Sequence, residues 1–190
     1  MRGLVLCHVA HEPLPLGSKL KARWLRQACD AYFPTVAALI DKRPEALMCL
    51  LQQADNDPLQ APGGAVLRTV LIEFLFERVR GKDHPALLHR TESVFMFSSK
   101  QSVRRYLAEY LQEPRPVYEC EVESGDPFFG DMALINRIRV KLTRGLAVQV
   151  AEIEETASLY WRGGDPASMD WPEALAPSGS VKVLREISLD

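Results

Sequence analysis

Two residues near opposite ends of the chain have side chains suited to chemistry on a charged ligand. His8 lies inside the apolar run of residues 4–10, and Glu173 begins the sequence Glu-Ala-Leu-Ala-Pro. An imidazole can donate or accept a hydrogen bond near neutral pH. A carboxylate beside a centre that becomes positive stabilises charge that exists only in the transition state. Simpler explanations stand beside these: His8 as a core histidine with satisfied hydrogen bonds, and Glu173 as an exposed loop residue.

A pair of aromatic residues lies in the middle of the chain. Phe95 and Tyr106 have ten residues between them, the first in a strand-like segment and the second in a helix-like one. Two flat rings can hold a planar cationic ring by stacking and cation–π attraction. Packing of a strand against the following helix explains the same pair without a ligand. Ser98 and Ser99 lie between the rings; either hydroxyl can bond a ligand, and Ser99 also suits the N-cap of the helix.

Charged residues offer weaker candidates. Arg90 precedes the strand-like segment, where a guanidinium could clamp a pyrophosphate through two hydrogen bonds; a solvated loop arginine is the alternative. His84 and His89 have no third clustered ligand, so we expect no metal site. A short basic stretch contains Arg137, Arg139, Lys141 and Arg144. It fits a solvated face, and contact with nucleic-acid phosphates is the less favoured alternative.

Composition and motifs exclude several classes of protein. The 190 residues are 47% hydrophobic and 25% charged, which is typical of a globular protein rather than a disordered or fibrous one. A net charge of −2 gives no overall attraction to nucleic acid or to an anionic membrane. The chain lacks a G-x-x-x-x-G-K-[ST] phosphate loop, a G-x-G-x-x-G motif, a G-x-S-x-G elbow and an H-E-x-x-H motif. The commonest nucleotide hydrolases and zinc peptidases are therefore not expected.

Location follows from the apolar stretches and the cysteines. Charged residues interrupt the longest apolar stretches, so we expect no membrane span and no membrane partner. The start of the chain lacks a convincing secretory signal. No C-x-x-C pair occurs among the four cysteines, which are Cys7, Cys29, Cys49 and Cys120. We expect reduced, buried thiols in a cytoplasmic protein.

The hydrophobic pattern indicates helices and strands that must position these residues. The N-terminal part predicts a strand over 4–10, a helix from Ser18 to near Pro34 with a further helical stretch to 40, a helix over 44–53, a loop over 55–64, and a helix over 66–80 ended by Gly81. The remainder predicts strands over 93–97, 117–122 and 181–187, helices over 101–112 and 147–161, and a loop around Asp126 and Asp131. Residues 134–142 fit a strand or a helix equally well.

Three groups of residues, taken in order, resemble the ADP-ribosyltransferase superfamily. The first is Leu6-Cys7-His8-Val9-Ala10 followed by Leu16-Gly17; the second is Ser93-Val94-Phe95 with Tyr106 in the next helix; the third is Glu173-Ala174-Leu175-Ala176-Pro177. An arginine before Ser-Val-Phe, a Tyr-Trp-x-Gly at 160–163 and the late glutamate are most similar to uncharacterised bacterial and phage relatives of those transferases. Val9-Ala10 departs from the usual small-threonine pair, and Phe95 replaces a tyrosine.

The resemblance implies an α+β fold with an ADP-ribosyltransferase-like split β-sheet. One domain would span 1–190, with a helical insert of about 18–80 after the first strand. NAD would be the substrate, held by His8, Arg90, Phe95, Ser98 and Tyr106, with Glu173 as the catalytic carboxylate. The enzyme would be a mono-ADP-ribosyltransferase, a kind of glycosyltransferase, acting on an unidentified macromolecular or small-molecule acceptor.

Two alternatives stay open. One is a catalytically inactive transferase-like binding or inhibitory protein, of phage or effector type, acting on a host protein. The other is a nucleic-acid-directed transferase that uses the basic stretch at 137–144. Glu173 distinguishes the enzyme from the inactive protein, because only the enzyme needs its carboxylate.

Overall fold

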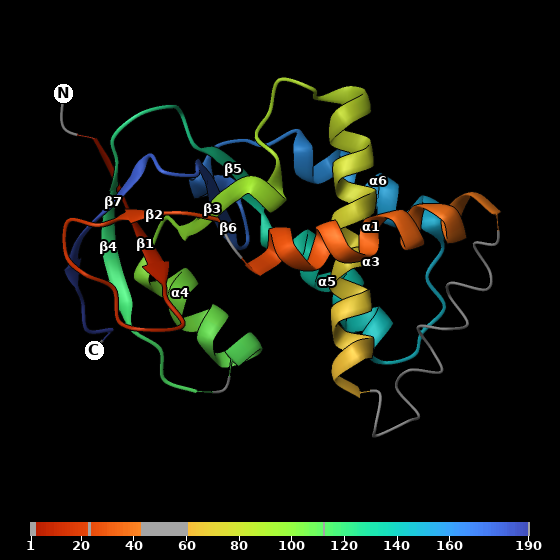
Figure 1. Ribbon diagram of the computed structural model, residues 1–190, viewed down its shortest axis with the longest axis horizontal. Helices are drawn as coiled ribbons and strands as arrows, with labels where there is room; N and C mark the ends of the chain where they lie inside the picture. The colour runs from red at the N-terminus through yellow and green to blue at the C-terminus, as the bar shows by residue number, and fades with distance from the viewer. Residues whose placement is uncertain (1–2, 23, 43–60, 112, 190) are drawn as a thin grey trace. The chain divides into compact units, whose positions relative to one another are not determined.

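The computed structural model describes residues 3–22, 24–42, 61–111 and 113–189 (Figure 1). These residues form two compact units, each treated by itself below. The sheet unit comprises Met1–Ala22, Glu92–Asp131 and Gly163–Asp190, and the helical unit comprises Arg23–Thr91 and Met132–Arg162. Both units join segments that are far apart in sequence. The single domain over 1–190 stays a prediction.

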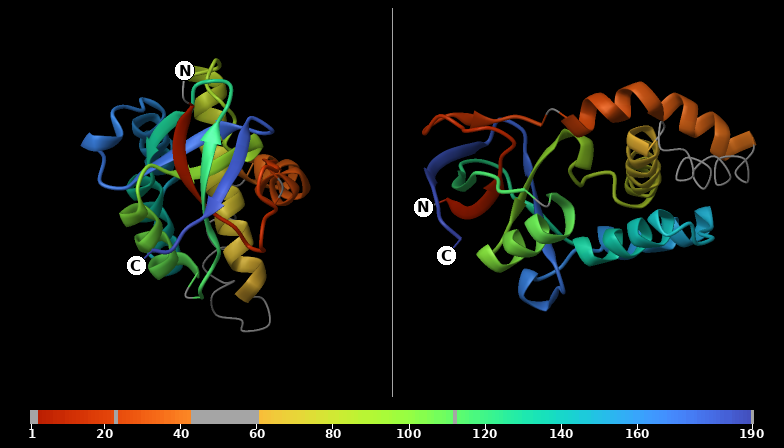
Figure 2. Two further views of the ribbon diagram at one scale, coloured as in Figure 1. Left: turned by 90° about the vertical axis from the view of Figure 1, so that its left-hand side faces the viewer. Right: turned by 90° about the horizontal axis from the view of Figure 1, so that it is seen from below.

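The sheet unit contains seven antiparallel strands among the described residues. Their spatial order is β2-β7-β4-β1-β3-β6-β5. The strands are β1 (Leu4–Val9), β2 (Lys19–Leu20), β3 (Ser93–Phe97), β4 (Val117–Val122), β5 (Phe128–Asp131), β6 (Pro172–Pro177) and β7 (Val181–Glu186). Figure 2 shows red β1, green β4 and blue β7 side by side although they come from the start, middle and end of the chain.

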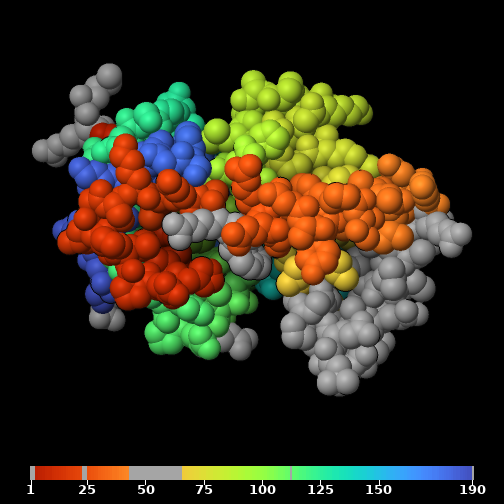
Figure 3. Space-filling model, viewed as in Figure 1, coloured from red at the N-terminus to blue at the C-terminus, as the bar shows by residue number. Residues whose placement is uncertain are grey.

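One face of this sheet carries its hydrophobic core. Side chains alternate between the two faces along each strand, so every second residue meets the same neighbours. The buried cluster on this face includes Leu6, Met96, Cys120, Ala174 and Val183. The segment between β1 and β2 lies on the surface visible in Figure 3, where Leu16 is 65% exposed.

The sheet is joined at its centre by a short pairing. β1 pairs with β4 over six residues, from Leu4↔Val122 to Val9↔Val117. In contrast, β1 pairs with β3 only at Cys7↔Phe97. The strands on either side, β2-β7-β4-β1 and β3-β6-β5, are therefore linked by one residue pair.

Helical segments complete the sheet unit. Helix α4 (Lys100–Tyr106) begins at Ser99, whose side chain accepts a hydrogen bond from Ser102 N, as expected of an N-cap. A π-helical turn, η2 (Leu107–Leu111), continues α4, and a short 3-10 turn, η3 (Pro166–Ser168), precedes β6. The helix predicted over 101–112 thus exists as far as Leu111, with a change of winding, and residue 112 lies outside the described residues.

The helical unit is built around α3. Its members are α1 (Trp24–Lys42), α3 (Ala61–Asp83), the 3-10 turn η1 (Arg90–Glu92, whose last residue belongs to the sheet unit), α5 (Met132–Thr143) and α6 (Val150–Trp161). Val70, Leu71 and Phe76 of α3 are completely buried. The Phe76 ring meets Tyr160 of α6 edge-on at 5.4 Å, so α3 and α6 share a core.

The first half of the chain corrects several expected boundaries. Lys19 and Leu20 form a strand paired with β7 rather than the start of a helix. The helix begins at Trp24 and runs through Pro34, because Cys29, Val36 and Ile40 are buried along it on both sides of the proline. Helix α3 already begins at Ala61, inside the expected loop, since proline is tolerated in a first helical turn. It also continues past Gly81, and the helix expected over 44–53 lies outside the described residues.

The second half of the chain confirms the strands at 93–97, 117–122 and 181–187 nearly residue for residue. Residues 134–142 are helical and belong to α5. The loop expected around Asp131 is instead strand β5, and Glu173, considered above as a loop residue, lies in strand β6. The mixture of helices and antiparallel sheet confirms the α+β class.

The three cysteines that the structure describes agree with the expectation of reduced, buried thiols. Cys7, Cys29 and Cys120 are free and buried, and burial raises the pKa of Cys29 and of Cys120 to about 12. Cys49 lies outside the described residues. Across the described ranges, every helix is too short or too polar to cross a membrane.

Candidate functional site

The His8 ring forms a hydrogen bond to the backbone of the neighbouring strand β3, next to the short β1–β3 pairing. Its Nδ1 lies 2.9 Å from the carbonyl oxygen of Phe95 on β3. Burial lowers the pKa of His8, more than the hydrogen bond to Phe95 raises it, and nearby His11 lowers it further. The ring is therefore neutral at pH 7. Since a carbonyl can only accept, Nδ1 carries the proton and Nε2 carries the lone pair.

Glu173 lies in a row of side chains that crosses the sheet. Cys7 pairs with Phe97, Phe97 with Glu173, and Glu173 with Gly130. Directly paired residues share a face of the sheet, so this row lies on the face opposite the hydrophobic core cluster. Glu173 is buried, at 3% exposure. A carboxylate is thus buried on the sheet's second face, on the strand next to edge strand β5.

Alternation divides the predicted site residues between the two faces. Phe95 is two residues from Phe97 and lies on the face of Glu173. His8 follows Cys7 and lies on the other face of β1, although its ring reaches the backbone of Phe95. His8, Phe95 and Glu173 therefore come from three adjacent strands, β1, β3 and β6, but only Phe95 and Glu173 share a face.

Aromatic rings line this second face. Phe97 lies 5.1 Å from Tyr106 between centroids, and Tyr106 stacks on Tyr110 at 5.1 Å. Tyr110 meets Trp171 edge-on at 5.7 Å. Tyr106 thus contacts Phe97 and Tyr110, and its expected pairing with Phe95 stays a prediction. Phe95 and Tyr106 remain only partly buried, so each keeps some accessible ring surface.

A cavity of about 470 Å³ adjoins the Phe97–Glu173 pair. Ser98, which follows Phe97, and Pro172, which precedes Glu173, both line it. Further lining comes from Ser102, Arg105 and Trp171. The guanidinium of Arg105 lies 4.3 Å above the Trp171 ring. The cavity thus offers serine hydroxyl groups beside the end of β3 and the start of β6.

Arg90 lies in the helical unit with its side chain buried. Its Nε donates to Glu73 at 2.9 Å and its Nη1 donates to the Tyr160 hydroxyl. The paired side chains of Arg90 and Glu73 are 5% and 6% exposed. A guanidinium committed in this way does not fit the expected role as a pyrophosphate clamp.

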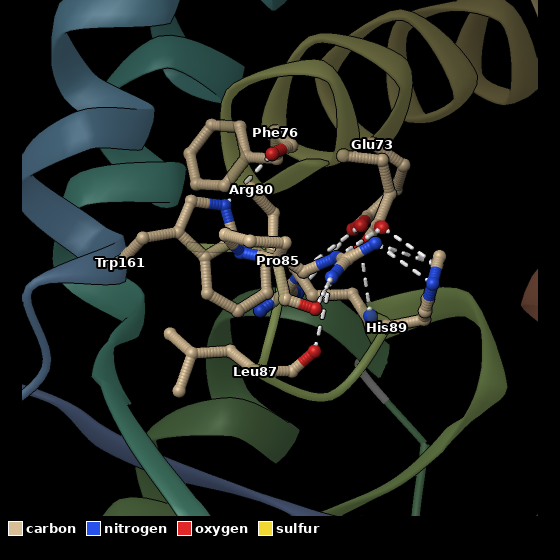
Figure 4. A network of polar contacts seen from close by, with 9 residues as sticks. Glu73, Phe76, Arg80, Pro85, Leu87, His89 and Trp161 are labelled. Carbon is tan, nitrogen blue, oxygen red and sulfur yellow. Dashed lines mark hydrogen bonds and ion pairs between the residues drawn. The ribbon is translucent and has the colours of Figure 1, made fainter. Parts of the chain in front are cut away.

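A second buried arginine extends this network (Figure 4). Arg80 donates to Glu77 at 2.7 Å and to the carbonyl oxygens of Pro85 and Leu87. His89, labelled in the same close-up, contacts Arg80, and its Nδ1 lies 2.9 Å from the Glu77 carboxylate. These bonds fasten the segment after α3 to the helix itself.

The basic stretch at 137–144 lies on and just after α5 and is partly neutralised. Arg139 donates to Asn136 on its own helix, and Lys141 pairs with Glu152 of α6. Within the described ranges, no group of three or more His, Cys, Asp and Glu residues could hold a metal ion.

Sequence reasoning missed Phe97, Trp171 and Asp131. Phe97 was identifiable, because it follows Phe95 by two residues, which places both on one face of a strand, and because it directly precedes the serines. Trp171 stands two residues before Glu173, and an aromatic residue so close to the expected motif was a usable signal. Asp131 accepts hydrogen bonds from Trp171 N at 3.0 Å and Asp170 N at 3.3 Å. No sequence signal marked that contact, since it joins residues about forty positions apart.

Comparison with known proteins identifies a family but no activity. No curated protein matches the chain. A family model described as "Protein of unknown function (DUF2441)" matches residues 43–189, which include every candidate site residue except His8. The match spans about three quarters of the chain, and the chain therefore belongs to the DUF2441 family.

Proposed function

We propose that this protein is an NAD-dependent mono-ADP-ribosyltransferase with an ADP-ribosyltransferase-like split sheet. The observation that carries the proposal is the meeting of β1, β3 and β6, where the sheet is joined by one residue pair. His8, Phe95 and Glu173 come to these strands from the start, middle and end of the chain. The fold therefore brings residues that are far apart in sequence onto three adjacent strands, with Phe95 and Glu173 on the same face.

Four residues fit the binding of NAD. Neutral His8 presents an Nε2 lone pair that accepts a hydrogen bond from a ribose hydroxyl. Phe95 and Tyr106 offer partly exposed rings for stacking on nicotinamide. Ser98 lines the adjoining cavity and offers a hydroxyl to ribose or carboxamide. Arg90 is left out of the site because its guanidinium bonds Glu73 and Tyr160.

Glu173 is proposed as the catalytic carboxylate. NAD supplies a nicotinamide–ribose bond that breaks with its electron pair leaving on nicotinamide and positive charge developing on the ribose. The negative charge of Glu173 stabilises this positive charge more in the transition state than in the bound substrate. The same carboxylate orients the acceptor nucleophile that forms the new bond. Burial strengthens both effects because the surrounding dielectric is low.

Release of nicotinamide from NAD by the purified protein tests the proposal. We expect slow release by the wild type and a rate at least ~100-fold lower in Glu173→Gln, which keeps the shape of the side chain and removes its charge. Glu154→Gln is the matched control, because Glu154 lies on α6 in the helical unit and pairs with Arg78. Equal rates in wild type and Glu173→Gln would contradict the proposal. NAD binding without cleavage would favour the inactive binding protein.

A further inference from the structure

The backbone immediately before Glu173 is held by a side chain from the neighbouring strand. Asp131 ends β5, and its two carboxylate oxygens accept from two successive amides, Trp171 N at 3.0 Å and Asp170 N at 3.3 Å. Asp131 and Pro172 are also paired in the sheet. The carboxylate therefore fixes the point at which the incoming chain enters strand β6.

Trp171 is anchored at the same point by helix α4 and the π-helical turn. Its indole is completely buried, and Nε1 donates to the carbonyl oxygen of Ser102 at 3.3 Å. Arg105 covers one face of the ring, and Tyr110 approaches it edge-on. Arg105 is itself oriented by Glu109 of the π-helical turn, whose carboxylate accepts from its Nε at 2.9 Å.

These contacts form a closed series of neighbours that includes Glu173. Glu173 pairs with Phe97, whose side chain contacts Tyr106; Tyr106 stacks on Tyr110, which contacts Trp171. Trp171 is two residues from Glu173 along the chain. The position of the carboxylate thus depends on where Trp171 sits, and Asp131 bonds the amide of that residue.

We propose that Asp131 is a positioning residue for Glu173, acting through the amides of Asp170 and Trp171. This inference rests on the proposed function for its kinetic consequence. Without the Asp131 carboxylate, both amides lose their acceptor and the start of β6 gains freedom to shift. A displacement of about 1 Å in a reacting group can lower a rate by about 100-fold.

Kinetics of nicotinamide release provide the first measurement. In Asp131→Ala we expect kcat to fall about 10- to 100-fold, with KM for NAD within about twofold of wild type. Asp131→Asn keeps one acceptor oxygen for Trp171 N and should recover most of the loss. Asp126→Ala is the matched control, because Asp126 is exposed in the turn before β5. We expect it to match wild type.

Nuclear magnetic resonance provides a measurement that needs no activity. In Asp131→Ala, but not in Asp126→Ala, amide exchange at Trp171 should accelerate at least about tenfold relative to the rest of the sheet. The carboxyl ¹³C resonance of Glu173 should shift in the same variant. An unfolding midpoint of Asp131→Ala close to that of wild type shows that these changes are local.

The outcomes separate this inference from the proposed function. If wild type releases nicotinamide and Asp131→Ala keeps its kcat, the positioning role is overturned while the proposed function stands. If wild type releases none, the proposed function fails, and the resonance and exchange of Glu173 and Trp171 alone decide the positioning role. Unchanged exchange and an unchanged Glu173 resonance in Asp131→Ala overturn it in either case.

Discussion

Each unit of this molecule buries a glutamate, and the two have different neighbours. Glu73 in the helical unit is 4% exposed and accepts two hydrogen bonds from buried Arg90. Glu173 in the sheet unit is 3% exposed and lies between Phe97 and Gly130, beside residues that line a cavity. The first arrangement is a buried ion pair with its partner in place. The second is a buried carboxylate in strand β6, directly after Pro172, which lines the cavity.

Because Glu73 and Glu173 are almost equally buried, burial alone does not identify a functional acid. Arg90 and Glu73 are buried more completely than most charged side chains, yet their bonds tie α3 to the segment that follows it. Glu173 is distinguished by its place in the sheet rather than by its exposure. We therefore expect changes at Glu73 to act on stability and changes at Glu173 to act on chemistry.

The largest expected effect on stability comes from breaking the Arg90–Glu73 pair. Glu73→Gln leaves a buried guanidinium without its carboxylate, so the free energy of unfolding should fall by about 3 kcal/mol or more. Replacing both residues by leucine should restore most of this loss, because no charge is then left buried. Urea unfolding measures both variants. A loss below about 1 kcal/mol in Glu73→Gln would contradict the structural role.

An intermediate effect is expected from acidification, through His8. Its folded pKa lies below the unfolded value near 6.5, so the unfolded chain binds more protons between these two pKa values. The contribution to stability is complete above about pH 6.5 and declines as pH falls, with a slope of at most about 1.4 kcal/mol per pH unit. His8→Gln should flatten this decline in unfolding experiments. An identical pH dependence in wild type and His8→Gln would show that His8 is not held neutral.

Two adjacent serines of the sheet unit, Ser98 and Ser99, are expected to differ in their effect on stability. Ser99→Ala removes the N-cap of α4 and should lower the free energy of unfolding by about 1 kcal/mol. Both serines line the cavity, so either change should weaken NAD binding severalfold. Ser98 is not the N-cap, so Ser98→Ala should leave stability nearly unchanged. Unfolding measured on both variants tests this difference, and an equal loss of stability in Ser98→Ala would contradict it.

The smallest effect is expected at a half-exposed ion pair of the helical unit. Arg78 and Glu154 have side chains that are 36% and 35% exposed, so solvent screens their attraction. Glu154→Gln should change the free energy of unfolding by less than about 1 kcal/mol. Urea unfolding beside Glu73→Gln makes the contrast direct; equal losses in the two variants would mean that burial does not set the strength of these pairs.

The elements that the sequence predicted best are those whose pattern is strong locally. Residues 93–97 and 117–122 carry apolar or alternating side chains that favour a strand whatever their partners. Lys19–Leu20 is a strand because β7 lies beside it, which no local pattern reveals. Strand β6 was missed because Pro172 and Pro177 indicate a loop, although both prolines stand at its ends, where they are tolerated.

The sequence indicated residues for the candidate site but not how those residues lie relative to one another. The order of motifs indicated His8, Phe95 and Glu173, and they lie on adjacent strands. The contact of Tyr106 with Phe97 could not be predicted, because it depends on the direction in which α4 leaves strand β3. The structural role of Arg90 could not be predicted from the sequence. Its partner Glu73 is seventeen residues away, and the sequence does not show which face of α3 packs against Arg90.

Calorimetric titration of NAD into the purified wild-type protein tests the central claim most directly. We expect the protein to bind one NAD per chain, and we expect His8→Gln and Ser98→Ala to bind it more weakly. Glu173→Gln should bind NAD nearly as well as wild type, because that carboxylate acts mainly on the transition state. Absence of binding heat at millimolar NAD, in protein shown to be folded, would contradict the claim that this sheet carries an NAD site.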